Sequence, residues 1–110
     1  PKTPKPQNPK TPNYWKDMGL EGKVAFITGG ASGLGLETAH LLKSKGVKLS
    51  IIDWNDDNLV SAWSILGEEA MIQKVDVTNE KECKIAIEKT FERFGAIHFC
   101  INSAGVGGGL

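Results

Sequence analysis

A glycine-rich turn that follows an apolar run most constrains what this chain can fold into. The run Val24–Thr28 has the length of a strand and no polar alternation, which predicts a strand covered on both faces. It leads into the sequence TGGASGLG at 28–35, and helical spacing follows from about Leu34 to Lys45. A strand, a glycine turn and a helix in this order predict one unit of a parallel α/β sheet.

The glycines in this turn have a geometric explanation. A diphosphate must come within hydrogen-bond distance of the backbone N–H groups at a helix N-terminus, where the helix dipole favours negative charge. Cβ atoms at the key positions would block that approach and the packing of helix against strand. Glycine turns are common, so the alternative is a turn without a ligand. Its position, after a buried strand and opening a helix, favours nucleotide phosphate binding.

The rest of the chain repeats the alternation of strand and helix. Further strands are expected at 48–53, 70–75 and 97–101, with helices at 55–66 and from Thr78 to about residue 94. Parallel strands joined by right-handed crossovers predict an α/β fold, a Rossmann-type doubly wound parallel sheet in part, with strand order 3-2-1-4. A ligand is expected where the winding reverses, above the first and fourth strands.

The expected helix ends follow from their flanking residues. Asn55 and Thr78 are the expected N-caps, and Gly46, Gly67 and Gly95 are the expected stops. One side of the last helix should be formed by residues 83, 86, 87, 90, 91 and 94, which fall at helical spacing.

An acid closes the second strand. Asp53 follows Gly35 by 18 residues, close to the ~20 at which a carboxylate accepts hydrogen bonds from an adenosine ribose. Such a carboxylate repels a 2′-phosphate, and neither the glycine turn nor Trp54 and Asn55 supplies a cation for one. NAD is therefore favoured over NADP, and over a flavin on size. The alternative is that Asp53 caps the next helix, a role that suits Asn55 better.

Two further loops meet the same edge of the predicted sheet. Asp76 follows the third strand and is placed to reach an adenine amino group, with loop capping as the alternative. The sequence NSAG at 102–105 ends the fourth strand, and its small residues let a ribose lie close. Asn, Ser and Gly are also ordinary turn formers, so this sequence alone indicates only a turn.

The histidines and two tryptophans are expected to have structural roles. His40 lies in a predicted helix and His98 in a predicted strand, and neither has an acid or nucleophile at a suggestive spacing. Trp54 and Trp63 are interpreted as packing residues rather than stacking platforms for bases. The sequence therefore indicates no catalytic residue and no metal site.

Two cysteines cannot form a disulfide framework. Cys83 and Cys100 also lack metal-ligand spacing. They are expected on a helix face and in a buried strand, as reduced packing thiols.

The motifs together resemble the short-chain dehydrogenase/reductase family. The family's TGxxxGxG turn, its DVT stretch and its NNAG sequence correspond to 28–35, to 76–78 and to NSAG at 102–105. The lead-in LEGKV at 20–24 is also typical, and the similarity runs over 19–106. Within the family, GGASGLGLETA is similar to the 3-hydroxyacyl-CoA dehydrogenase type 2 branch. The sequence DWN at 53–55 is instead similar to 15-hydroxyprostaglandin dehydrogenase.

The resemblance implies a set of NAD contacts. Ser32 and Leu34 would contact the diphosphate and nicotinamide side, Asp53 the ribose, and Asp76 with the Val77 backbone the adenine. Ser103 replaces the second Asn of the common pattern, which leaves its own contact open. The implied cofactor-binding residues are Gly29, Ser32, Gly33, Leu34, Gly35, Asp53, Asp76, Val77, Asn102, Ser103, Ala104 and Gly105.

The family's catalytic Ser, Tyr-x-x-x-Lys and Asn have no counterpart here. Tyr14 is the only tyrosine, it precedes the first strand, and Met18 stands where the Lys would be. The resemblance thus implies the N-terminal, NAD-binding half of a homo-oligomeric enzyme that transfers hydride between NAD and a secondary alcohol or ketone. This chain alone is expected to be inactive. The alternative is a non-catalytic short form that binds nucleotide or interferes with dimers.

Composition limits the remaining classes. All five prolines lie in the first 12 residues, among three lysines, which predicts a disordered Lys/Pro tail at 1–13 before a domain at 14–110. A basic docking arm is the alternative for this tail. Acidic and basic residues balance at 13 each, which argues against a nucleic-acid partner. No apolar run of membrane length and no targeting signal is found, so a cytoplasmic protein is expected, with mitochondria as the alternative from the branch resemblance.

Overall fold

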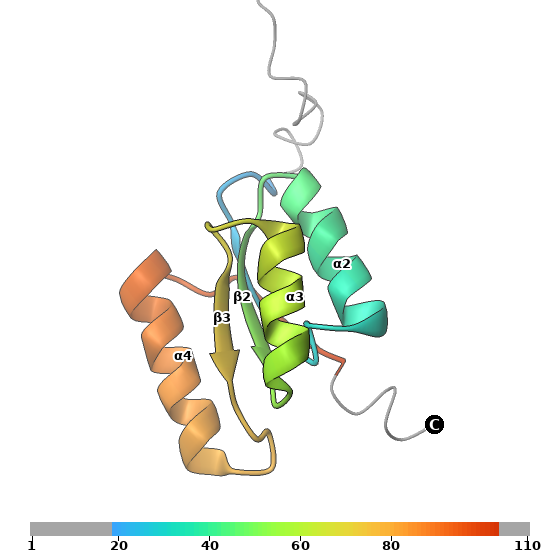
Figure 1. Cartoon of the computed structure of the whole chain (residues 1–110). Coiled ribbons are helices and arrows are strands. Elements are labelled where there is room, and N and C mark those ends of the chain that lie inside the picture. Colours follow the sequence, from blue (N-terminus) through green and yellow to red (C-terminus); the bar gives the residue numbers. More distant parts are fainter. Residues whose placement is uncertain (1–18, 104–110) are drawn as a thin grey trace, which may run out of the picture.

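The structure is a computed structural model that describes residues 19–103, in which strands and helices alternate along the chain (Figure 1). The predicted tail at 1–13, Ala104 and Gly105 lie outside the described residues. The elements are β1 (Val24–Thr28), α2 (Gly33–Ser44), β2 (Lys48–Asp53), α3 (Asp56–Leu66), β3 (Met71–Lys74), α4 (Glu80–Phe94) and β4 (Phe99–Asn102).

The four strands form one parallel sheet in the order β3-β2-β1-β4, which confirms the predicted order and the Rossmann-type fold. Val24 pairs with Lys48 on one side of β1, and Ala25 pairs with Phe99 on the other. The winding therefore reverses between β1 and β4. All the strands point the same way, so their carboxyl ends meet at one edge, where the three helices begin (Figure 1).

Helices cover both faces of the sheet. Ala25 and Ile27 pack with α2 and α3 on one face, while Phe26 packs beneath Ala86 of α4 on the other. This alternation explains why β1 is apolar throughout: both its faces are in the core, as its sequence predicted. Burial of both faces stabilises the sheet and thereby the positions of the carboxyl ends of its strands.

Four of the five residues expected at helix ends are confirmed. Asn55 caps α3 by accepting a hydrogen bond from the backbone N–H of Asn58 at 2.9 Å. Gly46, Gly67 and Gly95 follow the helices with positive φ angles, which explains why each helix ends there.

The expected cap of α4 is wrong by one residue. Asn79, not Thr78, accepts the hydrogen bond from the backbone N–H of Glu82, at 3.1 Å. Both the backbone N–H and the hydroxyl of Thr78 instead bond Asp76, so Thr78 belongs to the turn that precedes the helix. The strand bounds also differ from expectation, since β3 spans 71–74 and β4 spans 99–102.

The predicted apolar side of α4 is too wide. Ala86 and Thr90 are buried, whereas Ile87 and Phe91 are exposed. Cys100, expected in a buried strand, is exposed too. The reason is the position of α4, which packs over Phe26 and its neighbours in β2 and β3, while no described element covers the same face of β4.

Within residues 19–103, no helix is both long enough and apolar enough to cross a bilayer.

Candidate dinucleotide-binding site

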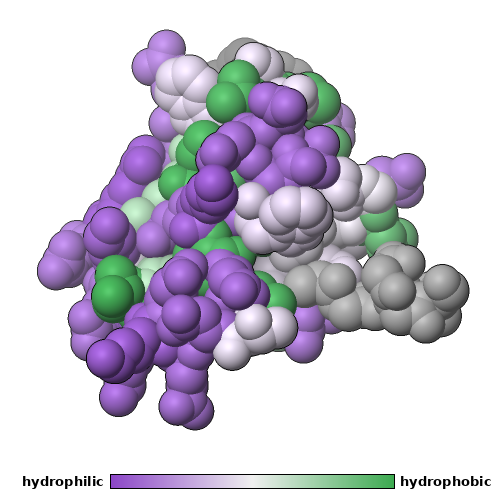
Figure 2. Space-filling view, turned by 60° about the horizontal axis from the view of Figure 1, so that its bottom comes forward, coloured by the Kyte–Doolittle hydropathy of each residue, from purple (hydrophilic) through white to green (hydrophobic). Residues whose placement is uncertain are grey.

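A hollow of about 900 Å³ opens at the carboxyl edge of the sheet. Figure 2 looks onto this edge, where hydrophilic side chains surround patches of hydrophobic surface. Ten of the twelve predicted contact residues are described, and nine of these ten line the hollow; Asn102 does not. The nine are Gly29, Ser32, Gly33, Leu34, Gly35, Asp53, Asp76, Val77 and Ser103. Their placement together makes the hollow the candidate site, while their contacts to a cofactor stay a prediction.

The N-terminus of α2 is open toward an anion. The first N–H groups of a helix have no partner within the helix and carry a partial positive charge. Ser32 is the N-cap but makes no side-chain cap bond, and no acid occupies the first turn. The other two helices are closed, because an Asn side chain caps each and two acids stand in each first turn. Of the described helices, α2 is thus the one suited to a phosphate.

Gly35 explains how the turn and the helix come so close. A Cβ built at this position would lie 2.1 Å from the carbonyl oxygen of Gly29 and 2.7 Å from Ser103 Oγ. Neither atom leaves room for a methyl group. Gly35, the last glycine of the turn, is therefore required by packing of α2 against the turn after β1 and the end of β4, as its position predicted.

Asp53 is fixed by the backbone around it and is only 6% exposed. Its Oδ1 accepts hydrogen bonds from the N–H groups of Trp54 at 2.8 Å and Asn55 at 3.2 Å, and its Oδ2 accepts one from Ala31 at 3.3 Å. The carboxylate thus joins the end of β2 to the glycine turn. It does not cap α3, which is the work of Asn55. Three of the about four acceptor sites of the carboxylate are thus used, and the one that remains, on Oδ2, can accept from a donor in the hollow.

Trp54 corrects an expectation from the sequence. It was interpreted as a packing residue, yet it is 70% exposed and lines the hollow. The physical reason is that β2 ends at Asp53, so the next side chain leaves the sheet and cannot reach the core. Trp63 is also partly exposed, on α3.

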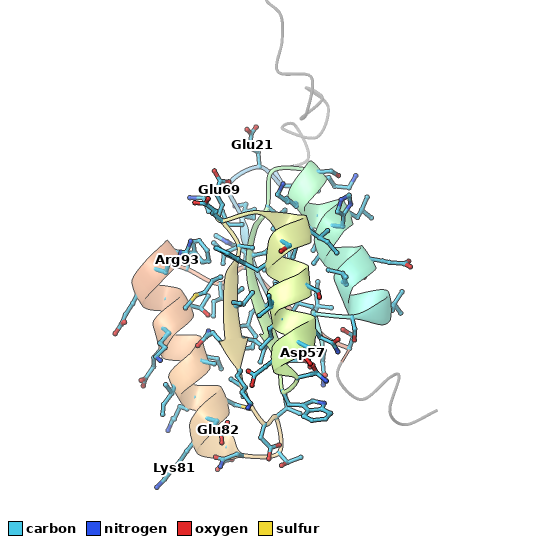
Figure 3. The ribbon with its side chains drawn as sticks, viewed as in Figure 1. Glu21, Asp57, Glu69, Lys81, Glu82 and Arg93 are labelled. Atoms are coloured by element: carbon cyan, nitrogen blue, oxygen red, sulfur yellow. The ribbon has the colours of Figure 1, made fainter. Side chains whose placement is uncertain are left out.

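Asp76 shapes the loop after β3. Its Oδ1 accepts hydrogen bonds from the Thr78 backbone N–H at 2.9 Å and from the Thr78 hydroxyl at 2.6 Å. The hydroxyl bond and then the backbone bond lower the pKa of the Asp76 carboxyl below its usual value. Glu82 holds the same loop from α4, where Figure 3 labels it, by accepting from the Asp76 N–H at 2.9 Å. Loop capping by Asp76 is therefore observed, and its contact to adenine stays a prediction.

Asn102, the last residue of β4, and Ser103, which follows it, tie β4 to the neighbouring strand β1. The Thr28 hydroxyl donates to Asn102 Oδ1 at 2.8 Å, and the Ser103 hydroxyl donates to the Thr28 carbonyl at 2.8 Å. Both bonds lie where the winding reverses. Ser103 is short enough to sit beside Gly35, which gives this departure from the family pattern a packing role.

His98 has the structural role that was predicted. Its Nδ1 accepts a hydrogen bond from the Val24 N–H at 2.9 Å, just before β4 begins. Among the described residues, no group of three or more His, Cys, Asp or Glu side chains could hold a metal ion.

Sequence reasoning did not assign six of the residues that line the hollow to the site: Trp54, Asn58, Lys74, Val75, Thr78 and Glu82. The position of Lys74 could have been predicted, because this residue stands at the carboxyl end of an expected strand, two residues before Asp76. Asn58 and Glu82 lie on helices, and the direction of their side chains depends on how α3 and α4 cross the sheet.

The family model described as short chain dehydrogenase matches residues 23–109. The chain belongs to the short-chain dehydrogenase family. This result confirms the resemblance seen in the glycine turn and in the sequences at 76–78 and 102–105.

Relatives from several branches match this short-chain dehydrogenase chain at comparable identity. Short-chain dehydrogenase reductase 3a of Arabidopsis thaliana is 40% identical over 88 residues, which cover 79% of this chain and 34% of the relative. The 3-hydroxyacyl-CoA dehydrogenase type-2 of Bos taurus is 37% identical over 87 residues, covering 79% and 33%. The chain therefore spans about a third of the length of the curated relatives it matches.

Solved structures agree with the fold. The 3-ketoacyl-(acyl-carrier-protein) reductase from Brucella melitensis, determined in complex with NADH, is 31% identical. It superposes with a TM-score of 0.71 over 74% of this chain and 33% of the reductase. A short chain dehydrogenase from Bacillus anthracis is 30% identical, with a TM-score of 0.74 over 77% and 36%.

Proposed function

We propose that this chain binds NAD at the hollow, and that it serves as the cofactor-binding portion of a dehydrogenase. The observation that carries the proposal is the Asp53 carboxylate, held by three backbone N–H groups at the end of β2 on the wall of the hollow. A fixed carboxylate at this place can accept a hydrogen bond from the adenosine ribose through the remaining site on Oδ2. The open N-terminus of α2 suits the diphosphate.

The preference for NAD over NADP follows from charge. The 2′-phosphate of NADP would approach a buried carboxylate whose own hydrogen bonds keep it in place. Two negative groups at hydrogen-bond distance repel each other, most strongly where water is excluded. Neither the glycine turn nor the residue after Asp53 provides an Arg or Lys to offset that repulsion.

Two side chains of the hollow offer apolar surface to the adenine base of the dinucleotide. Trp54 presents an exposed indole at the rim of the hollow, and Val77 lines its wall on the loop after β3. An indole face and an apolar side chain are both suited to contact with a flat aromatic ring. Adenine would lie between them, with its amino group toward the Asp76 loop.

The reaction that we propose for the complete enzyme is reversible hydride transfer between NAD and a secondary alcohol or ketone. The nicotinamide ring, when bound, accepts or supplies the hydride. The residues of this chain orient the cofactor, and the remaining two thirds of a relative's length would supply the groups that exchange a proton with the substrate. The relatives reported above are named as dehydrogenases or reductases, which favours this role over a non-catalytic short form.

Calorimetric titration of the purified chain with NAD and with NADP tests the proposal. NAD should bind more tightly than NADP, and Asp53→Asn should weaken NAD binding by about tenfold, because a charged hydrogen-bond acceptor is lost. Asp57→Asn is the matched control, since it removes one charge from the first turn of α3, four residues along the chain and outside the hollow. A folded chain that binds neither dinucleotide would contradict the proposal, as would equal losses in the two variants.

A further inference from the structure

Lys74 places a cation beside the carboxylate that is proposed to reject NADP. It ends β3, lines the hollow, and is the register partner of Asp53 in the neighbouring strand. Register partners in a parallel sheet direct their side chains to the same face. Lys74 therefore emerges on the side of the sheet where Asp53 faces the glycine turn. Its side chain is 62% exposed and free to change direction.

Asp56 holds this cation in the structure. Lys74 Nζ lies 3.0 Å from Asp56 Oδ2 and makes a salt bridge with it. Asp56 is the first residue of α3, where the helix dipole favours a carboxylate. The neighbouring acid, Asp57, makes no ion pair within residues 19–103, although it stands in the same helical turn (Figure 3).

We propose that Lys74 is a latent contact for a 2′-phosphate and that Asp56 withholds it. Cofactor choice would then depend on two carboxylates: Asp53 repels the phosphate directly, and Asp56 keeps the nearby cation occupied. The inference rests on the proposed function, because it places the adenosine ribose at Asp53. It adds a determinant of specificity that lies on β3 and α3, outside the glycine turn and the residue after β2.

The exposed salt bridge is weak enough to be exchanged. Both side chains of the pair are about two thirds exposed, and such pairs contribute little to stability. A phosphate dianion offers Lys74 more charge than one carboxylate, and a charge-assisted hydrogen bond to it changes affinity by about tenfold or more. Releasing Lys74 from Asp56 has a smaller effect on affinity for the phosphate, about two- to fivefold.

The experiment measures the ratio of NADP to NAD affinity by calorimetry in the Asp53→Asn background, where direct repulsion is reduced. Adding Lys74→Met should lower this ratio about tenfold, whereas Lys48→Met, at the opposite end of β2, should not. Adding Asp56→Asn should raise the ratio about two- to fivefold above Asp57→Asn. The two acids share a helical turn, so the difference between them isolates the release of Lys74.

Several results would overturn the inference. They are an unchanged ratio in the Lys74 variant, equal ratios in the Asp56 and Asp57 variants, or no NADP binding by a folded Asp53→Asn chain that still binds NAD. In Asp53→Asn an NH2 group replaces the oxygen that accepts the hydrogen bond from the Ala31 N–H, which can disturb the glycine turn. The Asp56→Asn and Asp57→Asn variants are therefore also compared with Asp53 intact, and the ratio of NADP to NAD affinity should again be higher in Asp56→Asn. Failure of the unaltered chain to bind NAD is a separate result, and it would refute the proposed function together with this inference.

Discussion

Gly35→Ala is the substitution for which the structure predicts the largest loss of stability in the glycine turn. The added Cβ would lie 2.1 Å from the Gly29 carbonyl oxygen, and Cβ atoms do not approach other heavy atoms closer than 3.0 Å. The two backbone segments must therefore separate by about 0.9 Å, the difference between these distances. Gly29 resists this movement because its N–H donates to the Ile52 carbonyl at 2.7 Å.

The magnitude follows from these contacts. Overpacking of a close contact costs about 1–3 kcal/mol. Weakening the Gly29 bond and the bond from Ser103 to Thr28 adds about 1 kcal/mol each. The expected loss is therefore about 3–5 kcal/mol, a large part of the stability of a small domain.

Gly33→Ala is the matched control. A Cβ at Gly33 would meet no atom within 4 Å, but its φ is +55°. The cost is that of one left-handed residue, about 1–2 kcal/mol. Urea unfolding followed by circular dichroism at 222 nm measures both variants, with thermal unfolding as a second measurement. The reasoning would be refuted if Gly35→Ala cost less than Gly33→Ala, or if it left the urea midpoint within experimental error of the unaltered chain.

Three further predictions concern the core, the loop after β3 and the rim of the hollow. Thr90→Val removes a buried hydroxyl that lies 2.8 Å from Ser50 Oγ, so it should cost about 1–3 kcal/mol in urea unfolding. Ser50→Ala should cost less stability in the Thr90→Val chain than in the unaltered chain, because the contact between the two hydroxyls is already lost there. Equal costs in the two chains would contradict the contact. Thr78→Val should raise the pKa of Asp76 toward its usual 3.8 in a carboxyl NMR titration, because the main cause of the lowering is lost. The stabilisation of this turn by the Asp76 carboxylate is fully present above pH 3.8 and should be lost as the pH falls through the lower pKa of the folded state. An unchanged Asp76 titration in Thr78→Val would refute the Thr78 hydroxyl as the cause of the lowered pKa. NAD should quench Trp54 fluorescence in a titration against a Trp54→Phe chain, and equal quenching in both would exclude stacking on this indole.

The elements that the sequence predicted well are those in which local pattern and burial agree. The apolar run of β1, the glycine turn and the acid at Asp53 each require one arrangement of the backbone, and the structure has it. Gly35 could be assigned to packing because a helix that starts directly after a strand must approach it closely. These features together fix the carboxyl edge of the sheet and most of the lining of the hollow.

The errors arise where a residue type fits two environments. Thr78 is a residue type that is common at N-caps, but its hydroxyl donates a hydrogen bond to Asp76, and Asn79 is the N-cap of α4. Trp54 was expected to pack because large apolar side chains are usually buried, yet the strand ends one residue before it. Cys100 alternates correctly along β4, but burial needs a covering element, which periodicity within a strand does not reveal.

The three helix N-termini show how the chain selects one place for an anion. All three begin at the carboxyl edge of the sheet, so each offers unpaired N–H groups to the same solvent. Asn55 and Asn79 accept from those groups in α3 and α4, and acids in both first turns oppose further negative charge. Ser32 leaves α2 open. One of the two acids in the first turn of α3, Asp56, also holds Lys74, so a carboxylate that directs a diphosphate toward α2 would also disfavour a second phosphate beside Asp53.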